Sequence, residues 1–287
     1  MDRREEIGKL LEYSPEQLVK ESQGKLIILE NLEELHKHFA RAIADEIKGN
    51  NELGRETKLI LPVGPTGQYP ILVKIINEEE ISLKNCRFFF MDENCFDDGT
   101  AIPAEHPLSF KGEMQDFLFE HIPPELAIPE TQIIFPNHLN VENLSEMIAN
   151  AGGIDTCYGG IGIHGHVAFN EPEEGVKDTS PRIVKLNAYT VTINVIRAKV
   201  GGDVVNFFTR AVTLGMKEIL GAKRIRLYCR NDITDIDWAN TVCRLAALGT
   251  PGDDYPVTHI REHPDYRIIT DKNTAARPRY NLYQLGH

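Results

Sequence analysis

The sequence predicts an α/β protein, a three-layer α/β/α sandwich around a mostly parallel, Rossmann-like sheet. Short apolar runs that end in Gly, Pro or acidic residues alternate with longer segments in which apolar residues recur three and four apart. The short runs are typical of strands buried on both faces, and the longer segments are typical of helices with one buried face. Their regular alternation favours right-handed crossovers, which place helices on both faces of a parallel sheet.

The predicted elements follow one another from a first clear helix over 31–48. There Leu35, Phe39 and Ile43 recur four apart, so one face of the helix is buried. The run TKLILPVG at 57–64 predicts a buried strand that Pro and Gly terminate. Further strands are predicted at 86–93, 131–136, 154–163, 224–229 and 266–270, and further helices at 71–80, 109–122, 140–152 and 235–248, whereas 204–220 has mixed character.

Length and charge limit the class of protein and partner. A chain of 287 residues, of which 41% are hydrophobic, can bury one large core, and we expect a single domain over 1–287. The net charge of −12 disfavours nucleic acid as the main partner, although a local pocket can still bind a small phosphorylated ligand. No apolar stretch approaches the roughly 20 residues of a membrane span, and the charged start lacks a secretory core. We therefore expect a cytoplasmic protein without a membrane partner.

Five cysteines, Cys86, Cys95, Cys157, Cys229 and Cys243, are odd in number and form no C-x-x-C pair. This pattern disfavours both a disulfide framework and a structural zinc site. Because four of them lie in or beside apolar runs, we expect buried, reduced thiols.

Ligands of parallel α/β sheets bind beyond the carboxyl ends of the strands, so the loops there are the candidate sites. Three such loops, GPTG, MDENCFDDGT and GIHGHVAFNEP, hold most of the glycine, carboxylate and imidazole. In GPTG, the amides of Gly64 and Gly67 and the hydroxyl of Thr66 could bind a phosphate at a helix N-terminus. The segment matches neither common phosphate-loop pattern, and a plain strand-to-helix turn explains it equally well.

The third loop raises a choice between metal binding and proton transfer. His164 and His166 are two residues apart and in an extended segment could share a zinc ion. Asp92, Glu93 or Glu171 could supply a third ligand. Against a metal site, the intervening glycine favours a turn, and no H-E-x-x-H set is present.

Proton transfer uses the same residues differently. Asp92 or Glu93, at a strand end, could abstract a proton from a carbon next to a carbonyl, while the imidazole of His166, in the loop that also holds Glu171, transfers one to or from a ring oxygen. A nearby carboxylate would then hold the imidazole and raise its pKa. Taken singly, these residues are also ordinary capping and turn residues, but their joint placement on converging loops favours a site.

Four motifs together resemble one enzyme family. LPVGPT, MDENC, EHPLSF and GGIGIHGHVAFNEP occur in the order and spacing of the glucosamine-6-phosphate deaminases, which are related to the 6-phosphogluconolactonases. A later segment, VTLG at 212–215, is similar to a further pattern of the family. The resemblance runs from about residue 25 to about residue 272 and implies the family's fold, with an N-terminal extension over about 1–24.

The resemblance implies that a sugar phosphate is opened, isomerised from aldose to ketose and stripped of ammonia, without metal or cofactor. Asp92 matches the carboxylate that moves a proton between two sugar carbons. His166 matches the imidazole that assists ring opening, and Glu171 matches the carboxylate paired with it. We therefore expect an amino-sugar phosphate deaminase/isomerase whose partner is a sugar phosphate or a related sugar. A homo-oligomer is compatible with this prediction.

The sequence departs from the family patterns in two places. His164 stands where the family usually has Asp before the Gly-His pair, and an imidazole there would lower rather than raise the pKa of His166. At the phosphate end, Val63 replaces a hydroxyl, and Pro65 removes an amide donor because proline has no N–H.

Two basic residues that bind the phosphate in the family are displaced as well. One is expected near 194–196, where Arg197 is the nearest candidate, and the other near Thr234, in the acidic stretch RNDITDID. Each charge-assisted contact is worth about 1.5–3 kcal/mol, so phosphate binding would be weakened. Two alternatives therefore stay open: a 6-phosphogluconolactonase-like hydrolase, and a catalytically weakened sugar-binding or regulatory protein.

Overall fold

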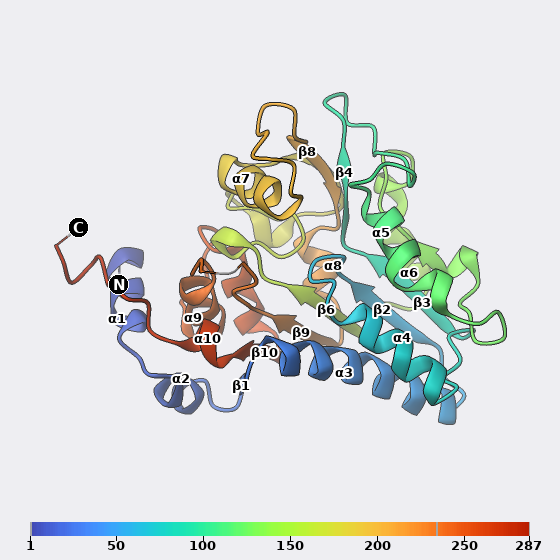
Figure 1. The fold of residues 1–287 in the computed structure, drawn as a ribbon, viewed down its shortest axis with the longest axis horizontal. Coiled ribbons are helices and arrows are strands. Elements are labelled where there is room, and N and C mark those ends of the chain that lie inside the picture. The colour runs from blue at the N-terminus through green and yellow to red at the C-terminus, as the bar shows by residue number, and fades with distance from the viewer. Residues whose placement is uncertain (1, 234, 287) are drawn as a thin grey trace.

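The computed structural model describes residues 2–233 and 235–286 and confirms the predicted three-layer architecture (Figure 1). A seven-stranded sheet of order β1-β10-β9-β6-β2-β3-β5 forms the middle layer, and its strands pair in parallel. These strands are β1 (Leu26–Leu29), β2 (Thr57–Leu61), β3 (Cys86–Phe90), β5 (Ile133–Ile134), β6 (Thr156–Gly160), β9 (Arg224–Tyr228) and β10 (Tyr266–Asp271).

Side chains that alternate along the strands contribute to two separate cores. Leu59 and Leu61 of β2 belong to one core, and Ile60 between them belongs to the other, as the two-residue period of a strand requires. The first core is shared with α3 and α4, and the second with α6, α8 and α9. These helices are α3 (Leu32–Glu52), α4 (Tyr69–Glu78), α6 (Leu144–Asn150), α8 (Met216–Leu220) and α9 (Asn240–Leu248).

The predicted strand at 86–93 is interrupted after Phe90. The chain leaves the main sheet there, and β4 (Asp92–Cys95) pairs antiparallel with β8 (Arg210–Thr213), which also pairs with β7 (Arg182–Lys185). This second sheet, which the sequence does not predict, lies with α7 (Ala188–Arg197) above the main sheet in Figure 1. The mixed stretch 204–220 is mixed because it contains both β8 and α8.

All five cysteines are buried and free, as predicted. Within the described ranges, no helix is both long enough and apolar enough to span a lipid bilayer.

Several short elements complete the fold. They are α5 (Phe110–Phe117), α10 (Lys272–Ala275), and the 3₁₀ turns η1 (Phe119–His121), η2 (Glu130–Gln132), η3 (Val141–Asn143), η4 (Ile163–Gly165), η5 (Val176–Asp178) and η6 (Pro256–Glu262).

The order of strands reverses between β2 and β6. From β2 the sheet continues through β3 and β5 in one direction, and from β6 it continues through β9 and β10 in the other. The loops after β2 and β6 therefore diverge, and such a switch point is where open α/β sheets bind ligands. The backbones of the two loops approach closely. A Cβ added to Gly160 would lie only 2.9 Å from the carbonyl oxygen of Gly64.

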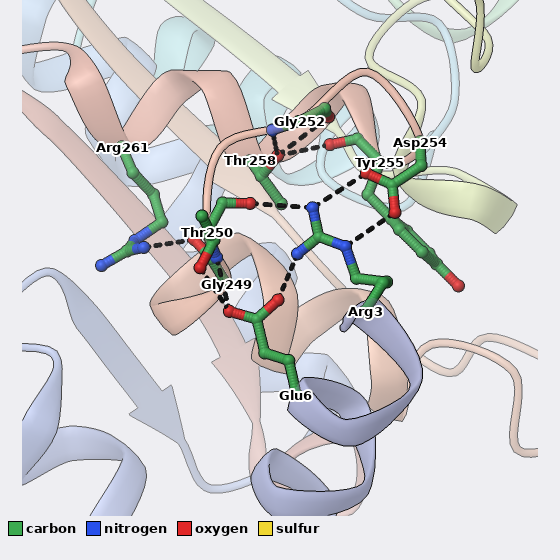
Figure 2. A network of polar contacts seen from close by, with 9 residues as sticks. All are labelled: Arg3, Glu6, Gly249, Thr250, Gly252, Asp254, Tyr255, Thr258 and Arg261. Atoms are coloured by element: carbon green, nitrogen blue, oxygen red, sulfur yellow. Dashed lines mark hydrogen bonds and ion pairs between the residues drawn. The ribbon is translucent and has the colours of Figure 1, made fainter. Parts of the chain in front are cut away.

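The N-terminal segment forms two helices, α1 (Arg3–Leu11) and α2 (Pro15–Glu21), which pack against α9. Figure 2 shows the polar network that fastens α1. Nε and Nη2 of Arg3 lie 2.7 and 2.8 Å from the two carboxylate oxygens of Asp254. The carboxylate of Glu6 contacts Arg3 and accepts two hydrogen bonds of 2.7 Å from Thr250. The predicted extension is thus folded onto the rest of the chain, whereas the single-domain organisation stays a prediction.

A buried guanidinium joins the same terminal segments. Arg244 of α9 is 1% exposed and donates to the carbonyl oxygens of Leu10, Tyr13 and Ala275 at 3.1, 3.4 and 2.9 Å. Within 2–233 and 235–286 it forms no ion pair with a carboxylate. Its stabilising role is therefore to satisfy backbone carbonyls that would otherwise be buried without donors.

We expect Arg244→Met to lower the free energy of unfolding by roughly 2–3 kcal/mol, because buried carbonyls lose their donors while the apolar volume is kept. Urea titration followed by circular dichroism measures the change. Arg4→Met, at an exposed position of α1, is the matched control and should stay within about 0.5 kcal/mol of the parent. Equal stabilities of the two variants would contradict the role assigned to Arg244.

Candidate active site

A cavity of about 360 Å³ lies beyond the carboxyl ends of β2, β3, β6 and β9. The segment after each of these neighbouring strands contributes to its lining, and α7 contributes from above. Among the residues selected from the sequence, the cavity is lined by Gly64, Thr66, Asp92, His166 and Arg197. The segment after β9 was not among the three loops selected.

Asp92 lies at the start of β4 with its carboxyl group toward the cavity, and it is 8% exposed. Burial, and then the charge of Glu93, raises the pKa of Asp92 to about 8. The carboxyl group therefore holds a proton at neutral pH and becomes a base in mildly alkaline solution. Such a pKa suits a group that takes and returns protons near neutrality.

Glu93 follows Asp92 in the strand and does not line the cavity. Its carboxylate accepts hydrogen bonds from the backbone N–H groups of Phe110 and Lys111 at 3.0 and 2.9 Å and from the hydroxyl of Ser109 at 2.9 Å. These groups form the N-terminus of α5, where a carboxylate stabilises the unpaired amides. In this structure Glu93 positions α5 and contributes to the raised pKa of Asp92.

His166 is buried with its ring against the backbone of Gly162, where a side chain would overlap the imidazole. Its Nδ1 lies 3.4 Å from the hydroxyl oxygen of Thr190 in α7. Burial, and then the charges of Arg197 and His164, lowers the pKa of His166 to about 3. His164 lowers the pKa of His166, as expected from the sequence, but burial lowers it more. The imidazole of His166 is thus neutral across the physiological range.

Glu171 does not line the cavity, and it forms no ion pair with His166 in the part of the chain that the structure describes. Its Oε2 accepts a hydrogen bond of 2.6 Å from the N–H of Asn187, and its Oε1 is buried with no hydrogen-bond partner among the described residues. Burial raises the pKa of Glu171, and the nearby Thr190 hydroxyl partly opposes this increase. Thr190 therefore lies near both groups, where the family resemblance implies a direct pair. The catalytic role of Glu171 stays a prediction.

His164 and Gly67 also lie outside the lining of the cavity. His164 has a positive φ of 59°, and its ring packs edge-on against Tyr189 with centroids 4.3 Å apart. A Cβ on Gly67 would overlap the ring of His36, so glycine is required there by packing. The imidazoles of His164 and His166 thus have different surroundings. Across the described ranges, no three His, Cys, Asp or Glu side chains gather as a metal-binding group.

Two lining residues that the sequence did not suggest are Arg230 and Asp232, just after β9. Nη2 of Arg230 and Nη2 of Arg197 each lie 2.9 Å from a different carboxylate oxygen of Asp232. Burial lowers the pKa of Arg230 to about 10, so it remains a cation at neutral pH. Thr234, near which a basic residue was expected, lies outside the described residues. The strand-end rule applied to RIRLYC would have selected Arg230.

Asn94 and Glu113 also line the cavity and were not selected from the sequence. Nδ2 of Asn94 donates to the carbonyl of Leu108 at 3.1 Å, which fixes the orientation of the amide. Its Oδ1 is buried and has no donor among the described residues. Burial raises the pKa of Glu113. Asn94 and Glu113 thus add an amide and a carboxyl group to this wall of the cavity.

No protein-family model matches the chain. A glucosamine-6-phosphate deaminase of Mycoplasma mycoides subsp. mycoides SC is 31% identical over 258 residues, which cover 88% of this chain and 97% of the relative. The chain belongs to the glucosamine-6-phosphate deaminase family. A second deaminase, from Caenorhabditis elegans, is 32% identical over 208 residues and covers 71% and 74% of the two chains. The predicted family membership is thereby confirmed.

Solved structures show the same fold. A monomeric glucosamine-6-phosphate deaminase matches with a TM-score of 0.77 at 24% identity, covering 88% of this chain and all of the other. A 6-phosphogluconolactonase from Thermotoga maritima matches with a TM-score of 0.60 at 16% identity, covering 86% and 98%. At these identities the match concerns the fold alone. It agrees with the predicted Rossmann-like, deaminase-type architecture.

The surroundings of His166 predict that its imidazole does not take up a proton between pH 8 and pH 5, because burial holds its pKa near 3. NMR of the histidine ring signals against pH measures this directly, and His166→Gln assigns the signal by removing it. A midpoint near 6.5 for that signal would show that the ring is solvated and contradict the buried geometry.

Proposed function

We propose that this member of the deaminase family converts glucosamine 6-phosphate, or a related amino-sugar phosphate, to the ketose phosphate and ammonia. The observation that carries the proposal is that one cavity is lined by a carboxyl group, Asp92, with a pKa near neutrality, by the neutral imidazole of His166, and by two guanidinium groups. An aldose–ketose conversion needs a group that moves a proton between neighbouring carbons, and a phosphorylated sugar needs cationic donors. Deamination of glucosamine 6-phosphate, the activity for which the relatives are named, combines both needs.

The chemistry assigned to each group follows from its protonation state. The neutral imidazole of His166 takes the proton of the anomeric hydroxyl and returns one to the ring oxygen, which opens the ring. Ionised Asp92 removes the proton from C2 while the aldehyde oxygen at C1 gains a proton, which gives an enolamine. Asp92 then delivers its proton to C1 while the amine nitrogen loses one proton, which leaves an imine at C2. Water then adds to that carbon, and ammonia leaves to give the ketose. Thr190, close to both His166 and Glu171, positions the imidazole in this scheme.

Binding of the phosphate is assigned to the end of the cavity lined by Arg197 and Arg230. The loop after β2 approaches the same cavity through Gly64 and Thr66, but Pro65 between them offers no N–H donor. The guanidinium groups therefore carry more of the phosphate contact than a glycine-rich loop would. The affinity for an amino-sugar phosphate then depends mainly on these two arginines.

The direct test is to incubate the purified protein with glucosamine 6-phosphate and measure ammonia and fructose 6-phosphate. Release of both at ordinary enzyme rates supports the proposal. A second candidate, a catalytically weakened sugar-binding protein, is favoured by the missing direct contact between His166 and Glu171. If neither ammonia nor fructose 6-phosphate is released but the ligand raises the Tm of the protein, that candidate is supported. Hydrolysis of 6-phosphogluconolactone without ammonia release would support the lactonase alternative.

Asp92→Asn should lower kcat roughly 10²–10⁴-fold, because the amide cannot accept the C2 proton. The fold should be retained, since β4 is held by backbone pairing with β8 and, among the residues that the structure describes, no element is held by a hydrogen bond from the Asp92 side chain. Asp97→Asn, at an exposed position five residues on, is the matched control and should keep parental turnover. Near-parental kcat in Asp92→Asn would rule out Asp92 as the proton-transfer base.

The raised pKa of Asp92 also predicts how activity depends on pH. Only the ionised carboxylate is a base, so kcat/KM should rise as the pH increases through about 8 and level off above it. The titration of the substrate amine is measured separately and divided out. A profile that is flat or falling between pH 6.5 and pH 9 after this correction would contradict the assigned base.

A further inference from the structure

We propose that Asp232 is a specificity-determining residue, which occupies the guanidinium pair of the cavity and lowers its affinity for a phosphate relative to a hydroxyl at the end of the sugar. The proposal deepens the proposed function, since it concerns how the same cavity selects its substrate. Asp232 lines the cavity together with Arg197 and Arg230. It is therefore placed where it would meet the group at the end of the sugar.

The geometry makes Asp232 the common partner of both cations. Its Oδ1 lies 2.9 Å from Nη2 of Arg197 and its Oδ2 lies 2.9 Å from Nη2 of Arg230. The indole N–H of Trp238 donates to Oδ1 at 3.2 Å. The guanidinium carbon of Arg197 lies 4.8 Å from the centre of the Trp238 ring. The four side chains thus form one block in which a carboxylate bridges two guanidinium groups, as a bound anion would.

The charge of this block differs from that of a free arginine pair. Burial alone would raise the pKa of Asp232, but the charges of Arg230 and Arg197 outweigh it, and the pKa is lowered. The carboxylate is therefore ionised at neutral pH, and the block carries one net positive charge instead of two. A phosphate dianion that reaches the arginines meets this carboxylate at close range. Repulsion inside a partly buried site is stronger than in water.

The hydrogen-bonding capacity of the block suits a hydroxyl group. A hydroxyl can donate to the Asp232 carboxylate and accept from a guanidinium at the same time, whereas a phosphate dianion can only accept. Arg197 carries five N–H donors and its side chain is 30% exposed, so donors other than the Nη2 group bonded to Asp232 remain for such a ligand. An unphosphorylated sugar end therefore uses both partners that the block offers, and a phosphate uses only one.

The test compares parent and Asp232→Asn by calorimetry with three probes: inorganic phosphate, sorbitol 6-phosphate and sorbitol, none of which the enzyme can isomerise. Removing the carboxylate charge should tighten binding of both phosphate probes by about tenfold or more and should not tighten sorbitol binding. Asp235→Asn removes the same formal charge from an exposed position three residues on and should leave all three affinities unchanged.

Further variants test whether the gain in phosphate affinity arises at the arginines and whether the protein remains folded. The double variant Asp232→Asn/Arg230→Leu should lose the gain in phosphate affinity, which locates that gain at the guanidinium pair. Circular dichroism checks each fold, and Asp232→Ser replaces Asp232→Asn if the latter does not fold.

Two outcomes would overturn the proposal. Weaker phosphate binding in a folded Asp232→Asn would show that the carboxylate organises the arginines for the anion. Unchanged phosphate binding would show that phosphate does not meet Asp232. The binding measurements do not need turnover. A protein that releases no ammonia would therefore contradict the proposed function without contradicting this inference.

Discussion

Removal of ionisable groups from water governs the chemistry of this cavity. Burial is the largest cause of the pKa shifts of Asp92, His166 and Arg230, and in each case it favours the uncharged form. The consequences differ because the ordinary pKa values differ. The carboxyl group is brought close to neutrality, the imidazole is kept neutral, and the guanidinium stays charged. One physical effect therefore gives a carboxyl group that titrates near neutrality, a neutral imidazole and a charged guanidinium within the same cavity.

The positions of these groups depend on backbone packing and on strand register, each of which is sensitive to a change at a single residue. The close approach of Gly160 to Gly64 brings together the loops on both sides of the switch point. Pairing of β4 with β8 then sets which side chain of the strand faces the cavity. Because successive side chains of a strand point to opposite sides, Asp92 faces the cavity and Glu93 faces α5. A one-residue shift of register would exchange the proposed catalytic group with the carboxylate that caps α5.

The main layers of the fold could be predicted because their patterns are strong. β2 is apolar almost throughout, and α3 has one continuous buried face, so both are recognisable without knowledge of their neighbours. β7 and α7 were missed because β7 alternates between half-buried and exposed residues, and such short edge elements depend on tertiary pairing. Contacts of this kind have no local signal in the sequence.

The same distinction holds within the candidate site. The convergence of Asp92 and His166 on one cavity followed from the rule that loops meet at strand ends. The different roles of Asp92 and Glu93 could not be predicted, because they depend on the pairing partner of β4. Arg230 was missed for another reason: the family pattern directed attention to Thr234, although Arg230 lies closer to the end of its strand.

The most specific motif of the family, AFNEP, is maintained here largely by packing. Asn170 is fully buried, and its Nδ2 donates to the carbonyls of Val167 and Leu214 at 3.0 and 2.9 Å. Its Oδ1 accepts from Thr179 and Arg182 at 3.2 and 2.8 Å, so its hydrogen-bonding capacity is filled within the protein. A residue used in this way preserves the loop whatever the substrate is. The motif therefore identifies the family, while the proposed determinants of sugar choice are the residues after β9, where this chain departs from the family pattern.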